Sequence, residues 1–117
     1  MKHILEELNE TLGARGSLIV SKDGLLIAAA VAHVEVDRLA AMGAAILSDV
    51  RRSLAAAGMS EFTQCEVAAE QGKVILVAAG PTYLLVLVGA RIELGAGSVE
   101  IKSAARQVAR AAEFAAA

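Results

Sequence analysis

Residues able to bind a metal or act as a nucleophile are few in this sequence. The chain has two histidines, His3 and His33, and a single cysteine, Cys65. Metal sites usually draw ligands from closely spaced pairs, and these three residues form no such pair. A Cys65–His33 nucleophile would depend on the fold bringing the two side chains together, and a strand cysteine is more often a small core residue. We therefore expect no catalytic group, no metal and no cofactor.

Glycine-rich and arginine-containing stretches are the other candidates for chemistry. The phosphate-binding pattern G-x-x-x-x-G-K-[ST] is absent, which excludes a nucleotide triphosphatase of the P-loop type. Gly13–Gly16 and Gly95–Gly97 could form anion-binding loops, but glycines at such short spacing more often mark turns. Asp23 is a turn former rather than a general base. Arg51 and Arg52 could contact a partner's phosphate, although solvated or ion-paired arginines are more common.

Composition limits the class of protein further. The 117 residues suffice for one domain with one core. Eleven basic and thirteen acidic residues give a net charge of -2 without a basic cluster, which argues against nucleic acid as the main partner. A single cysteine excludes an internal disulfide framework and fits a reducing, cytoplasmic environment. The uncharged run 74–90 is short for a spanning helix and is broken at Gly80-Pro81, so we expect two strands there and no membrane insertion.

The elements that would position these residues begin with a helix and a hairpin. Apolar residues recur on one face of 3–12, which predicts an amphipathic helix that ends at Gly13. The runs 18–20 and 25–27 flank Asp23-Gly24, a pair that favours a tight hairpin turn because glycine accepts a positive φ. A connection over 32–36 follows, and Asp37 is the expected N-cap of the next helix.

The second helix, expected over 38–57, has two distinct faces. One carries an apolar stripe made of Leu39, Met42, Ile46, Leu47, Val50 and Leu54. The opposite face has small residues at its centre and charged residues at its edges, namely Ala41, Ala45 and Ser48 with Arg38, Asp49 and Arg52. Helix faces exposed only to water usually carry long charged side chains. This face is therefore either approached closely by another backbone, or solvated and occupied by alanine for its helix propensity.

Three strands and a last helix complete the chain. The strand expected over 61–69 is the most polar, which suits a sheet edge where unpaired backbone groups must be protected or paired. The strands over 73–79 and 83–90 are apolar almost without alternation, which favours a sheet covered on both faces. After a connection over 91–97, the helix over 98–115 has its apolar stripe at Ile101, Ala104, Ala105, Val108 and Ala112. The predicted order is α-β-β-α-β-β-β-α in one α+β domain over 1–117.

The stretch 13–28, GARGSLIVSKDGLLIA, together with this order of elements, resembles the Roadblock family of the dynein light chain, in particular its prokaryotic MglB-like branch. The resemblance implies a five-stranded antiparallel, profilin-like sheet with the second helix on one face and the first and third helices on the other. Family members dimerise by pairing their third strands, with the second helices around the two-fold axis. It thus implies a homodimer with contacts at Glu61, Thr63, Gln64, Cys65, Glu66, Ala41, Ala45 and Ser48.

The same resemblance implies a regulatory or scaffolding function rather than a catalytic one. Proteins of this branch bind a Ras-like small GTPase and can stimulate its hydrolysis of GTP. The partner is expected on the second-helix side of the dimer, at Arg38, Asp49 and Arg52. Longer regulators carry a tail after the last helix that this sequence lacks, so we expect GTPase binding more than activation. Two alternatives stay open, a passive adaptor of a larger assembly and a sensor that binds a small ligand.

Overall fold

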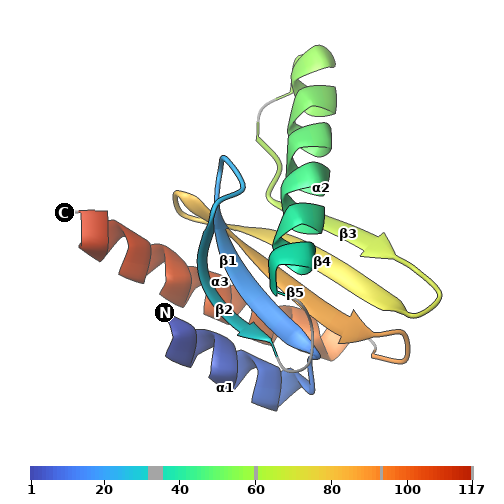
Figure 1. Cartoon of the computed structure of the whole chain (residues 1–117), viewed down its shortest axis with the longest axis vertical. Helices are drawn as coiled ribbons and strands as arrows, with labels where there is room; N and C mark the ends of the chain where they lie inside the picture. Colours follow the sequence, from blue (N-terminus) through green and yellow to red (C-terminus); the bar gives the residue numbers. More distant parts are fainter. Residues whose placement is uncertain (32–35, 60, 93, 117) are drawn as a thin grey trace.

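A five-stranded sheet in the order β2-β1-β5-β4-β3 forms the centre of the protein, and every neighbouring pair is antiparallel. The computed structural model describes residues 1–31, 36–59, 61–92 and 94–116 (Figure 1). The elements are α1 (Lys2–Leu12), β1 (Gly16–Ser21), β2 (Leu26–Val31), α2 (Val36–Ala56), β3 (Gln64–Ala68), β4 (Gly72–Ala79), β5 (Thr82–Gly89) and α3 (Leu94–Ala116). The predicted order of elements and the α+β class are confirmed.

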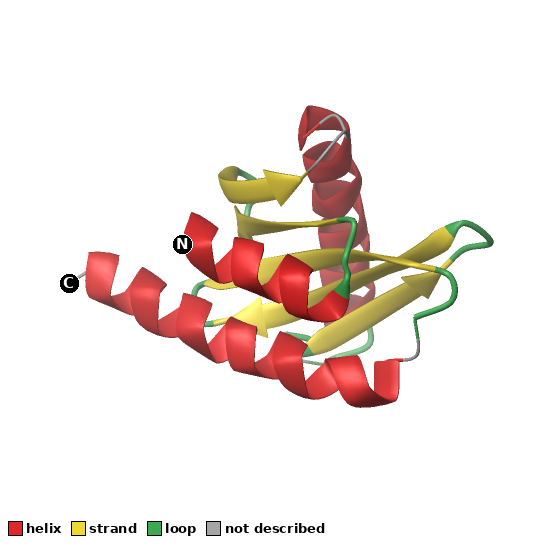
Figure 2. Ribbon diagram, turned by 90° about the horizontal axis from the view of Figure 1, so that it is seen from below, coloured by secondary structure: helices red, strands yellow, loops and turns green. Residues whose placement is uncertain are grey.

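Two apolar layers, one on each face of the sheet, hold the helices in place. Helices α1 and α3 lie side by side on one face and α2 lies on the other (Figure 2). Leu5 of α1 and Val108 of α3 are fully buried in the first layer, and Leu39 and Leu47 of α2 are buried in the second. Side chains of a strand point alternately to the two faces, so the central strands supply both layers. This explains why β4 and β5 are apolar almost without alternation.

The turn between β1 and β2 forms around the Asp-Gly pair, as predicted. The N–H of Gly24 donates to the carbonyl of Ser21 at 2.9 Å, and Gly24 has φ +84°. The N–H of Ser21 in turn donates to the carbonyl of Leu25 at 2.8 Å, so Leu25 closes the turn and β2 begins one residue later than expected. A Cβ at Gly24 would lie 2.6 Å from the Cβ of Ala44, which places this turn directly against α2.

Helix boundaries agree with the prediction at Gly13 and differ at two other places. Gly13 ends α1 in the left-handed conformation with φ +66°. Helix α2 begins at Val36, so Asp37 lies in its first turn and is not the N-cap; a carboxylate is favoured there by the helix dipole. Helix α3 begins at Leu94, so Gly95–Gly97 is helical and not a loop. Glycine lowers helix propensity by only about 1 kcal/mol per residue, which packing of the following turns can offset.

Candidate interaction surface

The two edges of the sheet are protected to different degrees. At the β2 edge, the Asn9 side chain of α1 donates to the carbonyl of Ala30 at 2.7 Å, and the register of β1 and β2 shifts between Ile19 and Val20. Side-chain caps and register irregularities discourage pairing with another chain. Strand β3 pairs only with β4, and no comparable contact to its outer side occurs within the described residues. The β3 edge is therefore the more open one, as expected for a polar edge strand.

Side chains of β3 alternate between the two faces of the sheet. Gln64 and Glu66 lie opposite residues of the α3-side core, whereas Cys65 and Val67 lie opposite residues of the α2-side core. Cys65 is half-buried, and the other residues of β3 are exposed. Thr63 precedes the strand, and its carbonyl accepts a hydrogen bond from the N–H of Ala78 at 2.9 Å. Strand β3 thus offers an accessible, mixed polar and apolar edge.

Helix α2 lies close to the sheet because of a glycine at the centre of its buried side. A Cβ at Gly43 would lie 2.5 Å from Cδ1 of Leu85 in β5, so no larger residue fits without a shift. The sequence interpretation did not single out Gly43, although a glycine inside an apolar helical stripe signals close packing. Helix α2 crosses the sheet and extends beyond it (Figure 1).

The face of α2 that points away from the sheet is exposed at all six predicted positions, namely Arg38, Ala41, Ala45, Ser48, Asp49 and Arg52. Arg52 and Asp49 form an ion pair at 2.7 Å, one turn apart. Both side chains are largely exposed, so the pair adds little to stability and leaves its outer surface available. Contact of this face with another protein stays a prediction.

Two contacts show how α2 is turned about its axis. Ala44 packs on Gly24, and Arg51 donates to the carbonyl of Lys22, so this flank faces the β1–β2 hairpin. A helix turns by about 100° per residue, which places Met42 on the opposite flank, toward the β3 side. Met42, a member of the predicted apolar stripe, is 37% exposed. Exposed methionines are common on contact surfaces.

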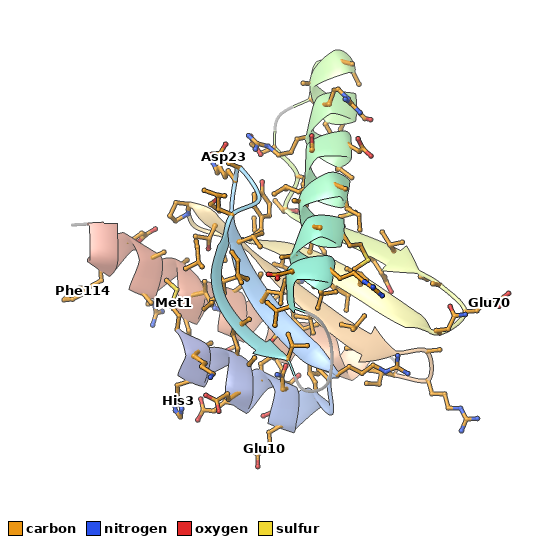
Figure 3. The ribbon with its side chains drawn as sticks, viewed as in Figure 1. Met1, His3, Glu10, Asp23, Glu70 and Phe114 are labelled. Carbon is orange, nitrogen blue, oxygen red and sulfur yellow. The ribbon has the colours of Figure 1, made fainter. Side chains whose placement is uncertain are left out.

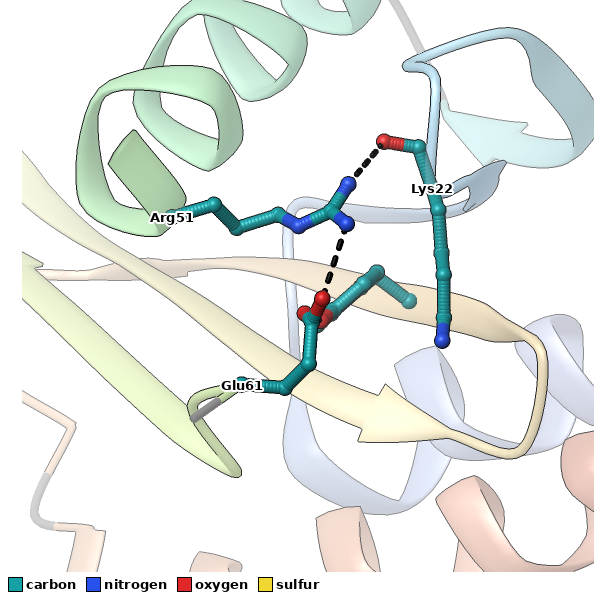
Figure 4. A network of polar contacts seen from close by, with 4 residues as sticks. Lys22, Arg51 and Glu61 are labelled. Carbon is teal, nitrogen blue, oxygen red and sulfur yellow. Dashed lines mark hydrogen bonds and ion pairs between the residues drawn. The ribbon is translucent and has the colours of Figure 1, made fainter. Parts of the chain in front are cut away.

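A polar network connects α2 to the segment before β3 (Figure 4). Arg51 donates to the carbonyl of Lys22 at 2.9 Å and to the Glu61 carboxylate at 2.8 Å. The Tyr83 hydroxyl donates to the second oxygen of Glu61 at 2.8 Å, and the Phe62 ring stacks on Tyr83 with 5.1 Å between centroids. These contacts hold residues 61 and 62 against α2 and β5. Strand β3 therefore begins at residue 64, and not at 61 as predicted.

The network changes the acidity of its members. The hydrogen bond from Arg51 lowers the pKa of the Glu61 carboxyl, and the bond from Tyr83 lowers this pKa further. Burial, and after it the hydrogen bond to Glu61, raise the pKa of Tyr83 to about 12. Glu61, expected at a dimer contact, thus has two partners in its own chain. Arg51 is ion-paired, which was the more common of the two expectations for that residue.

An exposed apolar cluster at the start of β2 was not recognised in the sequence. Leu25 is 68% exposed, and Leu26 and Ile27 are also exposed. These three residues, which we call the hairpin patch, directly follow Gly24, which lies against α2. Grouped apolar residues on a surface indicate an interaction site more than scattered ones do.

The remaining candidates for chemistry are dispersed. His3 lies 3.6 Å from the carboxylate of Glu7 on the exposed side of α1. His33 lies outside the described residues, so a Cys65–His33 pair is not tested. Among the residues that are described, no three His, Cys, Asp or Glu side chains gather closely enough to hold a metal ion. None of the helices in the described parts of the chain is long and apolar enough to cross a bilayer.

Three relatives illustrate the similarity of this chain to known proteins. The uncharacterized protein MJ1340 of Methanocaldococcus jannaschii is 37% identical over 106 residues, which cover 90% of this chain and 93% of the relative. The structure of gliding protein MglB from Thermus thermophilus matches with a TM-score of 0.84 at 24% identity, covering 96% of this chain and 87% of that one. A structure of MglB with a tetrameric arrangement matches with a TM-score of 0.86 at 25% identity, covering 97% of this chain and 88% of that one.

The family assignment follows from the sequence match as well as from the fold. The Roadblock/LC7 domain model matches residues 2–88, which run from the start of α1 to one residue before the end of β5. The stretch therefore includes the hairpin, the helix α2 and the open edge strand described above. This chain belongs to the Roadblock/LC7 domain family.

Proposed function

We propose that this protein is a cytoplasmic, homodimeric regulatory module that binds a Ras-like small GTPase and modulates it without catalysing a reaction of its own. The observation that carries the proposal is the open edge of β3 together with an exposed, small-residue face of α2. Membership of the Roadblock/LC7 family and the likeness to MglB support it.

The first step is association of two copies through β3. Antiparallel pairing of two β3 strands would satisfy the outer backbone groups and continue the sheet across both protomers. Such a contact is isologous, so each residue meets the same surface on the other copy. Val67 is an exposed apolar residue on the α2-side face of this edge and would be covered. Ala45, Ala41 and Ser48 would let the two α2 helices approach closely.

The second step is docking of the GTPase on the α2 side of the dimer. Arg38, Asp49 and Arg52 provide charged contacts there, and the hairpin patch provides apolar anchors at the flank of the same helix. Apolar anchors with a polar rim are the usual composition of a protein interface. The Ras-like identity of the partner comes from the family resemblance.

A passive adaptor would use the same surfaces without changing GTP hydrolysis. One related MglB structure has a tetrameric arrangement. The mass of this protein should therefore be measured over a range of concentrations, so that a tetramer would be detected as well as a dimer. Turnover of GTP by the partner, with and without this protein, separates a modulator from an adaptor.

The test combines mass with binding. Light scattering should report a dimer, and a Ras-like GTPase from the same organism should be captured in at least one of its GDP and GTP-analogue states. Leu26→Glu and Arg52→Glu should each weaken capture, whereas Arg110→Glu on the exposed side of α3 is the matched control. A protein that is monomeric at every concentration, or that captures the GTPase in neither state, would refute the proposal.

A further inference from the structure

A groove of about 460 Å³ lies between the β3 edge and α3, on the face of the sheet opposite α2. Its strand wall is formed by Thr63, which precedes β3, by Gln64, the first residue of β3, and by the end of β4. Its helix wall is formed by Lys102, Ala105, Arg106 and Ala109. The groove is therefore part of the same open edge, seen from the other face.

The helix wall of the groove is positively charged. Lys102 and Arg106 are exposed and lie one turn apart on the same flank of α3. Neither forms an ion pair with any residue in the described part of the chain. Like charges at this spacing repel each other, and an acidic group placed between them would reverse that effect. The groove is therefore suited to a carboxylate.

The strand wall points to the source of that carboxylate. Gln64 and Glu66 lie on the α3 face of β3, because they pair with Val77 and Ile75 of the α3-side core. Beyond this wall the sheet ends, so only another strand can extend it. In an antiparallel pair, residues directly opposite each other lie on the same face of the sheet. A second β3 strand would therefore bring its own Glu66 to the α3 face beside this groove.

Symmetry and charge then select the register. A two-fold axis perpendicular to the sheet requires one residue of β3 to lie opposite itself. Centring on Glu66 would place two carboxylates opposite each other, which is unfavourable. Centring on Val67 would place Glu66 opposite Ala68, and centring on Gln64 would place it opposite Phe62; neither of these residues lines the groove. Centring on Cys65 places Glu66 of each copy opposite Gln64 of the other, at the wall of the groove.

We propose that the groove formed by Thr63, Gln64, Lys102 and Arg106 receives Glu66 of a second copy, in a β3–β3 pair centred on Cys65. The proposal rests on the dimer of the proposed function and deepens it by specifying the register and its charge pairs. Each dimer contains two such contacts, one on each side of the axis.

The main test reverses the charges. Lys102→Glu with Arg106→Glu should raise the dimer dissociation constant about tenfold or more, since close charge pairs across interfaces couple strongly. Glu66→Lys should do the same, and the combination of all three changes should restore most of the affinity. Arg110→Glu, which also adds negative charge to α3 but outside the groove, should leave the dimer unchanged. Circular dichroism of each variant shows that the monomer is folded.

A second test uses the single cysteine of the natural sequence. In the proposed register the two Cys65 Cα atoms lie about 4.5–5.5 Å apart, which is within the range of a disulfide. Mild oxidation should therefore cross-link the dimer rapidly. A dimer that neither cross-links nor responds to the charge reversals would overturn this inference and leave the proposed function intact. A chain that is monomeric at all concentrations would overturn both.

Discussion

Replacing Gly24 by alanine tests whether the β1–β2 turn is packed on α2. Two costs are expected. Gly24 has φ +84°, a region where a side chain costs about 1–2 kcal/mol. The new Cβ would also lie 2.6 Å from the Cβ of Ala44, and overpacking of this kind costs about 1–3 kcal/mol. The sum predicts a loss of about 2–5 kcal/mol in the free energy of unfolding, a large part of the stability of a small domain.

A matched control separates the two costs. Gly58 has φ +75° with no atom within 4 Å of the position of a Cβ, so Gly58→Ala carries only the conformational cost of about 1–2 kcal/mol. The difference between the two variants, about 1–3 kcal/mol, measures the contact between the turn and the helix. Adding Ala44→Gly to Gly24→Ala should recover much of this difference, after allowing for about 1 kcal/mol of lost helix propensity.

Urea unfolding followed by circular dichroism is the appropriate assay. All variants must be measured at one protein concentration, because dimer formation stabilises the folded state by mass action. Equal losses for Gly24→Ala and Gly58→Ala would refute the close packing of the turn on α2. Such a result would also mean that the hairpin patch is not held next to α2.

Three further predictions concern the network, the core and the outer face of α2. Tyr83 is the single tyrosine of the sequence, and its pKa is about 12 in the folded protein against an ordinary 10.0. The unfolded chain therefore loses this proton at a lower pH than the folded protein does. The free energy of unfolding should fall as the pH rises from 10 to 12. Absorbance at alkaline pH should give the midpoint, which Glu61→Gln should lower, and a midpoint near 10 in the folded protein would contradict the network. Leu5→Ala should cost about 2–5 kcal/mol because Leu5 is fully buried, whereas Phe114→Ala should change stability by less than about 0.5 kcal/mol because Phe114 projects into solvent (Figure 3). Equal losses in the free energy of unfolding for these two variants, measured by chemical denaturation, would show that Leu5 of α1 is not packed in the core. Ser48→Glu should leave the fold intact and lower the dimer fraction in sedimentation, because it places two carboxylates where the α2 helices are proposed to meet; an unchanged dimer would place that face outside the contact.

Local signals in the sequence determined the elements and their order. The Asp-Gly pair fixed the first hairpin, Gly13 ended α1, and the apolar periods distinguished helices from strands. These features depend on residues within a few positions of each other, so the backbone expresses them wherever the segment lies. The polar composition of 61–69 likewise identified an edge strand. The resemblance to the Roadblock family then supplied the arrangement of strands, which periodicity alone does not contain.

The tertiary structure decided what depends on distant parts of the chain. Glu61 is predicted as a strand residue from its neighbours, but Arg51 and Tyr83 hold it outside the ladder. The β2 edge is protected because Asn9 of α1 donates a hydrogen bond to the carbonyl of Ala30, and these two residues are 21 positions apart in the sequence. The groove near β3 likewise forms only when the flank of α3 is laid along the sheet. Such contacts follow from how elements cross in space, and no spacing within a single element encodes them.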